Sequence, residues 1–215
     1  MPRINEELSA TLAAFQKNAP EVAKTPINAA RANIISTFDG SATISVGQPL
    51  PEFNLTNALG QKVSSKDLLS TGPLLIAFYR GSWCPFCNIS LRYFQTHLEE
   101  FTALGVTLVA ISPELPDTSL TTSDKLNLKF PVLSDVGNAF AHKLGIVWKQ
   151  PDTLRPVFEK FGHNLSVRTG NDDFEVPVPT TLLVDGSGIV RNTFIEPDYT
   201  KRLDPEVAIE WVKAL

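Results

Sequence analysis

The sequence has few of the residues that build metal centres. Its 215 residues include two cysteines and three histidines, whereas a structural zinc site usually takes four such ligands. The histidines His97, His142 and His163 do not stand at ligand spacing from the cysteines. We therefore expect no metal and no other cofactor.

Long apolar runs, an excess of basic residues and an export signal are also missing. No stretch approaches the roughly 20 apolar residues of a membrane-spanning helix, and the N-terminus lacks the basic start and apolar run of a signal peptide. The net charge of −4 argues against nucleic acid or an anionic membrane as a partner. These absences predict a cytoplasmic location, where a close cysteine pair is more often catalytic than structural.

The two cysteines stand together, in the segment Cys84-Pro85-Phe86-Cys87. The apolar run 74–79 before them predicts a buried strand, and the apolar spacing over 91–101 predicts a helix after them. Free backbone N–H groups at a helix start favour the thiolate, which is the reactive form of cysteine. The pattern indicates thiol redox chemistry; a structural pair and half of a zinc site are the alternatives.

Helical patterns come first in the chain. Residues 3–19 and 27–38 carry apolar side chains at helical spacing. We expect 1–45 to form a helical extension that packs on the main domain, 46–215. A dimer contact or a cover over the active site is the alternative role of these helices.

The main domain alternates predicted strands and helices, which favours an α/β fold with a mainly parallel sheet. Hairpins are predicted at 53–64 and 180–194, where turn residues separate short apolar segments. A helix at 204–215 closes the chain, with Pro205 in its first turn. The irregular stretch 146–176 either faces a substrate or is surface decoration.

Four blocks in this order resemble the peroxiredoxin-like branch of the AhpC/TSA group. They are residues 78–88, 110–113, 130–135 and 177–180. The resemblance covers roughly 46–212 and implies a thioredoxin fold, with a mixed central sheet and helices on both faces. It implies a thiol-dependent peroxidase for hydrogen peroxide or organic hydroperoxides, recycled by a thioredoxin- or glutathione-type reductant, with a homodimer as a further expectation.

The resemblance also implies roles for the cysteines. Aligning Phe78 and Tyr79 with the family's strand end puts Cys87 at the peroxide-attacking position. Cys84 is then the only thiol left to resolve the resulting sulfenic acid into a disulfide. Catalytic roles are therefore assigned to Cys87 and Cys84.

Two activating groups of the family are missing at the matching positions. Cys84 stands at the position of the family's threonine, and Pro179 stands at that of its distant arginine. Arg80 stands where the family has a proline. Arg80 is the candidate to supply the missing charge, because a nearby guanidinium lowers the pKa of a thiol. The alternative is an ordinary solvated loop arginine.

Substrate-binding roles are predicted for Arg80 and for three further residues. Trp83 is expected to flank the cysteines as an apolar wall, or else to pack in the core. Pro179 resembles the cis-proline that faces the cysteine pair in thioredoxin-fold proteins, and a cis bond costs only about 0.5–1 kcal/mol before proline. That geometry would place Pro179 beside Cys84 and expose the Val178 backbone to an extended substrate; an ordinary proline before a strand is the alternative.

Two other functions stay open at this point. If Cys84 is the attacking sulfur, as in thioredoxins, the substrate is a disulfide and the protein is a thiol–disulfide oxidoreductase. The third hypothesis is a non-enzymatic redox sensor, which would react once and slowly.

Overall fold

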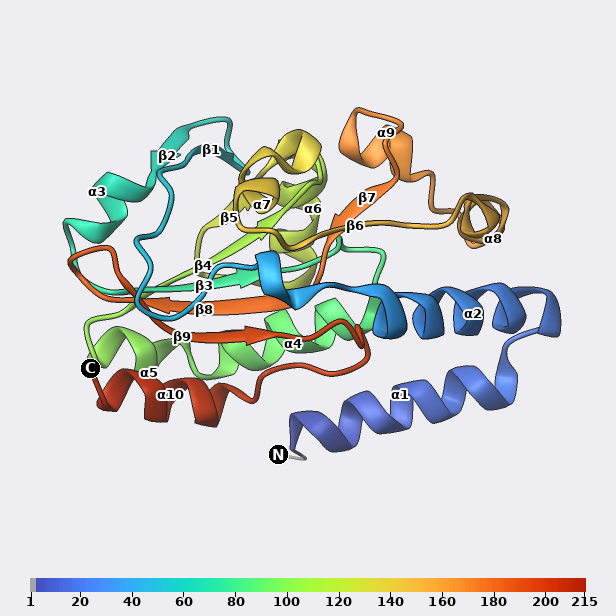
Figure 1. Ribbon diagram of the computed structural model, residues 1–215, viewed down its shortest axis with the longest axis horizontal. Helices are drawn as coiled ribbons and strands as arrows, with labels where there is room; N and C mark the ends of the chain where they lie inside the picture. The colour runs from blue at the N-terminus through green and yellow to red at the C-terminus, as the bar shows by residue number, and fades with distance from the viewer. Residues whose placement is uncertain (1–2) are drawn as a thin grey trace.

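The computed structural model describes residues 3–215 as a central sheet with helices on both faces (Figure 1). This arrangement confirms the predicted fold class. The strands are β1 (Asn54–Asn57), β2 (Lys62–Ser64), β3 (Leu74–Phe78), β4 (Thr107–Ser112), β5 (Val132–Ser134), β6 (Val147–Lys149), β7 (Glu175–Pro177), β8 (Thr180–Val184) and β9 (Val190–Ile195). Seven of them pair in the order β2-β1-β5-β4-β3-β8-β9, and β6 and β7 form a separate two-stranded sheet.

Helices precede, follow and connect these strands. The α-helices are α1 (Ile4–Asn18), α2 (Glu21–Thr37), α3 (Ser65–Leu69), α4 (Pro85–Thr96), α5 (Leu98–Ala103), α6 (Pro116–Leu126), α7 (Ala139–Lys143), α8 (Arg155–Lys160), α9 (Leu165–Thr169) and α10 (Pro205–Lys213). Three short 3₁₀ helices are η1 (Gly40–Ala42), η2 (Val136–Asn138) and η3 (Asp152–Leu154). None of the helices described within 3–215 has the length and apolar character needed to cross a membrane.

Only the three central strands pair with one another in parallel, so the prediction of a mainly parallel sheet is wrong. Strand β4 is parallel to both β3 and β5. The two hairpins attach at opposite edges, and both attachments are antiparallel, β1 to β5 and β8 to β3. Short loops can join antiparallel strands, whereas parallel neighbours need longer crossover connections.

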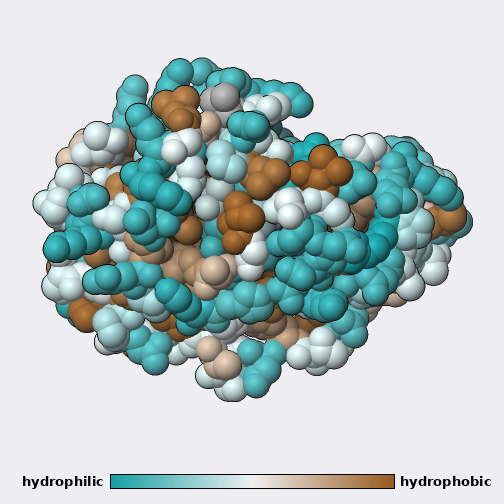
Figure 2. Space-filling view, turned by 90° about the horizontal axis from the view of Figure 1, so that it is seen from above, coloured by the Kyte–Doolittle hydropathy of each residue, from teal (hydrophilic) through white to brown (hydrophobic). Residues whose placement is uncertain are grey.

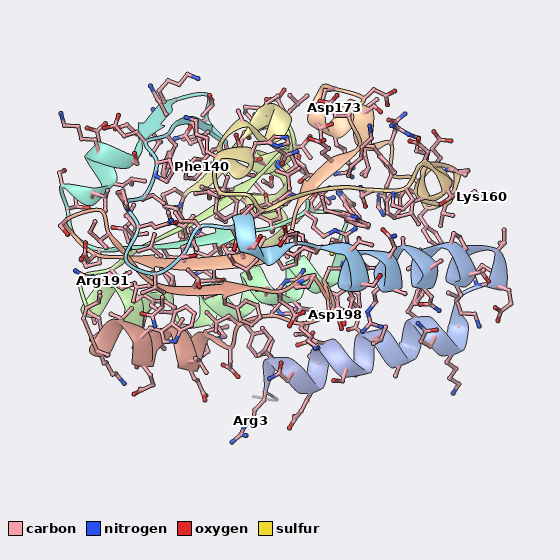
Figure 3. The ribbon with its side chains drawn as sticks, in the orientation of Figure 1. Arg3, Phe140, Lys160, Asp173, Arg191 and Asp198 are labelled. Carbon is pink, nitrogen blue, oxygen red and sulfur yellow. The ribbon has the colours of Figure 1, made fainter. Side chains whose placement is uncertain are left out.

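The sheet divides the hydrophobic core into two layers, and β3 contributes side chains to both. All five of its residues are buried, and its side chains alternate between the two faces of the sheet. Leu75 and Ala77 pack in the layer that contains α1, α4 and α10. Ile76 and Phe78 pack in the other layer, which contains Phe140 of α7, labelled above the sheet in Figure 3.

The predicted helix after the cysteines is interrupted at His97. Helix α4 ends at Thr96 and α5 begins at Leu98, with non-helical angles at the residue between them. The Tyr93 carbonyl accepts from Thr96 Oγ1 and lies 2.8 Å from His97 Nδ1. Side chains that occupy a backbone carbonyl in this way compete with the next helical hydrogen bond.

The N-terminal helices form a hairpin against the main domain (Figure 1). Helix α1 lies along α4, where Ile4 and Leu8 are buried and Glu7 pairs with Arg92. Helix α2 begins at Glu21, six residues before the predicted start. The prediction missed these residues because the first turns of the helix carry little of the apolar pattern. The face seen from above is largely hydrophilic, with hydrophobic residues in small separate patches (Figure 2).

Candidate active site around the cysteine pair

The cysteine pair lies at the start of α4, after the loop that connects β3 to this helix. Cys84 is the N-cap residue of α4 and Pro85 is its first residue, a position where the missing N–H costs no hydrogen bond. The Cys87 backbone N donates to the Cys84 carbonyl at 3.1 Å. Both side chains are buried, with 1% of Cys84 and 0% of Cys87 exposed.

Arg202 supplies a cation to Cys87, although it lies 115 residues away in the sequence. Its Nη2 donates to Cys87 Sγ at 3.0 Å, and its Nη1 donates to the carbonyls of Tyr199 and Lys201. None of the ion pairs found within residues 3–215 includes Arg202. A buried guanidinium that no carboxylate neutralises favours an anionic thiolate beside it.

The pKa values of the two thiols are shifted in opposite directions. Burial opposes ionisation of Cys87, but a hydrogen bond from Cys84 and the charges of Arg202 and Arg80 outweigh it and hold the pKa of Cys87 well below its ordinary value. Burial and the same hydrogen bond raise the pKa of Cys84 well above its ordinary value. The surroundings therefore favour the thiolate at Cys87 and the protonated thiol at Cys84.

Arg80 is a buried residue of the site and not a solvated loop arginine. Only 4% of it is exposed, and its Nη2 donates to Gln150 Oε1 at 2.9 Å. Its guanidinium carbon lies 4.1 Å from the ring centre of Tyr199 and 4.6 Å from that of Trp83, which is cation–π geometry. Arg80 thus adds a second positive charge at the cysteine pair.

A third arginine holds the loop that carries Arg202. Arg31 of α2 donates from Nε and Nη2 to the carboxylate of Asp198, at 2.7 and 2.6 Å, and Figure 3 labels Asp198 beside α2. Asp198 also accepts from the N and Oγ1 of Thr200. Burial opposes ionisation of Asp198, but these bonds outweigh it and lower its pKa to about 2. The N-terminal extension therefore fixes the loop that presents Arg202 to Cys87.

The sheet topology explains why this loop reaches the cysteines. Strands β3 and β9 are both antiparallel to β8, so they run in the same direction. The loop after β3 leads to Cys84, and the loop after β9 leads to Arg202. Both loops therefore lie at the same end of the strands.

The two sulfurs border different cavities. Cys84 lines a pocket of about 220 Å³ with mostly apolar walls, and Trp83 lies in that wall with its ring centre 4.9 Å from that of Phe158. Cys87 lines a much smaller cavity together with Arg202 and Pro179. The small cavity measures about 10 Å³, which is the space of about one water molecule.

The predicted geometry at Pro179 is wrong. Residues 3–215 contain no cis peptide bond. The Val178 N donates to Ile146 O at 2.7 Å, and the Val178 carbonyl accepts from Thr180 Oγ1 at 3.0 Å. The chain passes from β7 to β8 with two residues between them, so there is no tight reversal for a cis-proline to hold. Both backbone groups of Val178 are already hydrogen-bonded, and Pro179 borders the cavity of Cys87 and not the pocket of Cys84.

The irregular stretch 146–176 supports the loop before Cys84. Glu114, which is fully buried, accepts from the backbone N of Ser82 at 2.8 Å and pairs with Arg168 of α9 at 3.0 Å. Burial raises the pKa of Glu114 despite these bonds. The stretch thus holds the cysteine loop through α9 and lines the larger pocket through α8. Within residues 3–215, no group of three or more acidic, histidine or cysteine side chains could hold a metal ion.

Sequence comparison matches residues 46–193 to the AhpC/TSA family model. A candidate peroxiredoxin of Mycobacterium tuberculosis is 35% identical over 89 residues, which cover 41% of this chain and 56% of that protein. The thiol-disulfide oxidoreductase ResA of Bacillus cereus is 26% identical over 111 residues, covering 51% of this chain and 63% of that protein. The chain therefore spans little more than half the length of these curated relatives.

Structural comparison supports the fold. The crystal structure of peroxidoxin BcpB from Mycobacterium tuberculosis matches with a TM-score of 0.61 and 19% identity, over 80% of this chain and 98% of that one. At this level of identity the likeness shows that the two proteins share a fold.

Proposed function

Since the chain belongs to the AhpC/TSA family, we propose that it is a thiol-dependent peroxidase in which Cys87 attacks hydrogen peroxide or a small organic hydroperoxide. The contact between Arg202 and Cys87 Sγ, at 3.0 Å, is the observation that carries this proposal. It favours the anionic form of Cys87, and the thiolate is the nucleophile that peroxide reduction needs. The small cavity at Cys87 favours a peroxide without a bulky substituent near its oxygens.

The reaction follows from the ionisation of the pair. The Cys87 thiolate attacks one peroxide oxygen, the O–O bond breaks, and the leaving oxygen takes up a proton to become water or an alcohol. Cys87 is then a sulfenic acid. Cys84 attacks its sulfur, the S–O bond breaks, the hydroxyl leaves as water with the Cys84 proton, and a Cys84–Cys87 disulfide remains. An external thiol must return two electrons to complete the cycle.

The reductant, a homodimer and a cytoplasmic location remain predictions. The match to ResA covers a shorter part of this chain than the family model does. The thiol–disulfide oxidoreductase is therefore the alternative function that the following tests distinguish from the peroxidase.

One equivalent of hydrogen peroxide is expected to convert the reduced protein into its intramolecular disulfide. Intact-mass spectrometry should show the loss of two hydrogen atoms, and thiol labelling should show both cysteines blocked. Catalysed consumption of further peroxide in the presence of excess dithiothreitol would show turnover. Protein that keeps both thiols after peroxide, yet reduces insulin disulfides rapidly, would replace the peroxidase with the oxidoreductase.

Loss of the Arg31 side chain is expected to slow the peroxide step although Arg31 does not touch Cys87. In Arg31→Met the loop beyond Asp198 loses its bidentate anchor, and Arg202 moves. A misplacement of 1 Å can cost about 100-fold in rate, so a partial shift should cost roughly tenfold. The thiolate absorbance of Cys87 should also titrate at a higher pH, and Arg31→Lys should recover part of both effects.

Arg92→Met is the matched control for this prediction. It removes the ion pair with Glu7 that ties α1 to α4, and it leaves the loop of Arg202 untouched. A purely structural role for Arg31 would lower the melting temperature in both variants and leave the titration of Cys87 unchanged.

A further inference from the structure

The larger pocket is built in part by residues outside the matched family segment. Helices α1 and α2 contribute Leu12, Phe15 and Ile27 to its walls, and the family match begins only at residue 46. The pocket lies between this helical hairpin, α8 and the start of α4, and Figure 1 shows α2 between α1 and α8. The N-terminal extension therefore shapes what can approach the cysteine pair from this side.

This pocket reaches one sulfur of the pair only. Cys84 is in its wall, whereas Cys87 borders the small cavity on the other side. In the disulfide form, a molecule in the larger pocket therefore meets the Cys84 sulfur. Cys87 is then the leaving group, and the Arg202 contact suits it to that role, because a thiol with a low pKa leaves fastest in thiol–disulfide exchange.

The walls define the chemistry of the occupant. They are mainly aromatic and aliphatic, with Trp83, Phe158 and Phe161 among them. Two arginines also line the pocket. Arg31 is paired with Asp198, whereas Arg80 is 4% exposed and has no carboxylate partner among the ion pairs of residues 3–215. Its Nε is buried and makes no hydrogen bond. An apolar body with one negative charge at its reacting end fits this combination.

We propose that this pocket admits the reductant, a low-molecular-weight thiol with an apolar body that attacks Cys84 as its thiolate. This inference rests on the proposed function for its place in the cycle. The incoming sulfur bonds to Cys84 Sγ, the Cys84–Cys87 bond breaks, and its electron pair goes to Cys87, facing Arg202. A second thiolate attacks the sulfur of the bound thiol, and Cys84 leaves and takes up a proton. The products are the reduced pair and an external disulfide.

The pocket also disfavours a protein reductant. Only 1% of Cys84 is exposed, and the residue lies in the wall of a cavity of about 220 Å³. A cysteine on a folded partner would have to enter between the helical hairpin and α8. A small thiol needs far less room between these elements to approach the same residue.

The test measures the reductive step by itself. The disulfide is formed with diamide, so the experiment does not depend on reaction with peroxide. Its reduction is then followed by quenched thiol labelling, with benzyl mercaptan, with 2-mercaptoethanol and with reduced thioredoxin. The two small thiols have similar sulfur basicity and differ in apolar surface. We expect a saturable rate with benzyl mercaptan, at least about tenfold faster than with 2-mercaptoethanol at equal low concentration.

A pocket-filling variant locates the effect. Leu12→Trp narrows the pocket and should bring the benzyl mercaptan rate down to that of 2-mercaptoethanol. Leu59→Trp, at an exposed leucine in the β1–β2 turn that does not line the pocket, should leave both rates unchanged. The comparison of thiols on the unmodified protein stands even if Leu12→Trp folds poorly.

Three results would overturn the proposal. The first is equal rates for the two small thiols. The second is thioredoxin reducing the disulfide faster than benzyl mercaptan. The third is Leu12→Trp slowing oxidation by cumene hydroperoxide while leaving reduction intact, which would make the pocket an entry for peroxides. Failure of the peroxidase itself would instead appear as no reaction of the reduced protein with peroxide, whatever the thiols do.

Discussion

Cys87→Ser is expected to lower peroxide consumption to the rate seen without protein, whereas Cys84→Ser should still react once. The difference follows from which sulfur is the thiolate. Cys87 contacts Arg202 and has a pKa held well below its ordinary value, while burial raises the pKa of Cys84. A protonated thiol is a poor nucleophile towards peroxide. The remaining Cys84 therefore cannot replace Cys87.

The Cys84→Ser protein should accumulate a sulfenic acid on Cys87. The chain has only two cysteines, so no other thiol in the molecule can condense with it. Treatment with hydrogen peroxide and a sulfenate-trapping dione, followed by peptide mass spectrometry, should place the adduct on Cys87. In Cys87→Ser no adduct is expected on Cys84.

The reverse labelling pattern would exchange the roles of the two cysteines. An adduct on Cys84 in Cys87→Ser, with none on Cys87 in the other variant, would make the sulfur of the larger pocket the peroxide nucleophile. The proposed roles of both cavities would then be wrong as well. The double variant Cys84→Ser/Cys87→Ser is the control for adducts outside the site.

Arg202→Met is expected to slow the peroxide reaction roughly 10- to 100-fold near pH 7. The substitution keeps an apolar stem of similar length and removes the donor at 3.0 Å from Cys87 Sγ. A hydrogen bond to a charged group is worth about 1.5–3 kcal/mol, which corresponds to that range of rates. Arg80 remains as a cation near the pair, so the loss should not be total.

The pH dependence separates loss of the thiolate from a general disturbance. Burial alone raises a thiol pKa, so removing Arg202 should move the titration of Cys87 upward. The rate of the unmodified protein should rise less with pH than that of the variant, because its Cys87 has the lower pKa. The rate of Arg202→Met should rise with pH towards that of the unmodified protein. The reason is that the Cys87 thiol of the variant loses its proton only at higher pH.

Two further variants complete this test. Arg202→Lys keeps the charge without the planar fork, and we expect it to recover part of the rate. Arg191→Met is the control, since Arg191 pairs with Asp185 and Figure 3 shows it at the opposite end of the sheet from Asp198. Unchanged titration of Cys87 in Arg202→Met would mean that Arg202 does not activate the thiol.

Local segments of the chain were predicted correctly because their signals lie within a few residues. The apolar run of β3, the turns of both hairpins and the proline after Cys84 each specify their structure through nearest neighbours along the chain. The position of the cysteines at the start of α4 follows from the same local pattern. The sequence alone therefore determined the fold class and placed the cysteine pair at the start of a helix.

The elements that depend on distant contacts were predicted poorly. The stretch 146–176 was described from its sequence only as irregular, but it forms β6 and β7 as well as α8 and α9. Its two strands are short and pair only with each other, so neither carries a strong pattern of its own. The trans geometry before Pro179 likewise depends on where β7 ends and β8 begins.

The charged contact of Cys87 was decided by the tertiary structure. The sequence placed Pro179 where the family has an arginine, and the structure brings Arg202 to Cys87 from a loop that no motif marks. It reaches Cys87 because β3 and β9 run in the same direction and because Arg31 anchors the loop through Asp198. A side chain acts on a thiol through space, and its separation along the chain carries no information about that distance. The resemblance thus assigned the attacking role to Cys87, and only the packing of α2 and of the loop before α10 supplies the cation that lowers the pKa of that thiol.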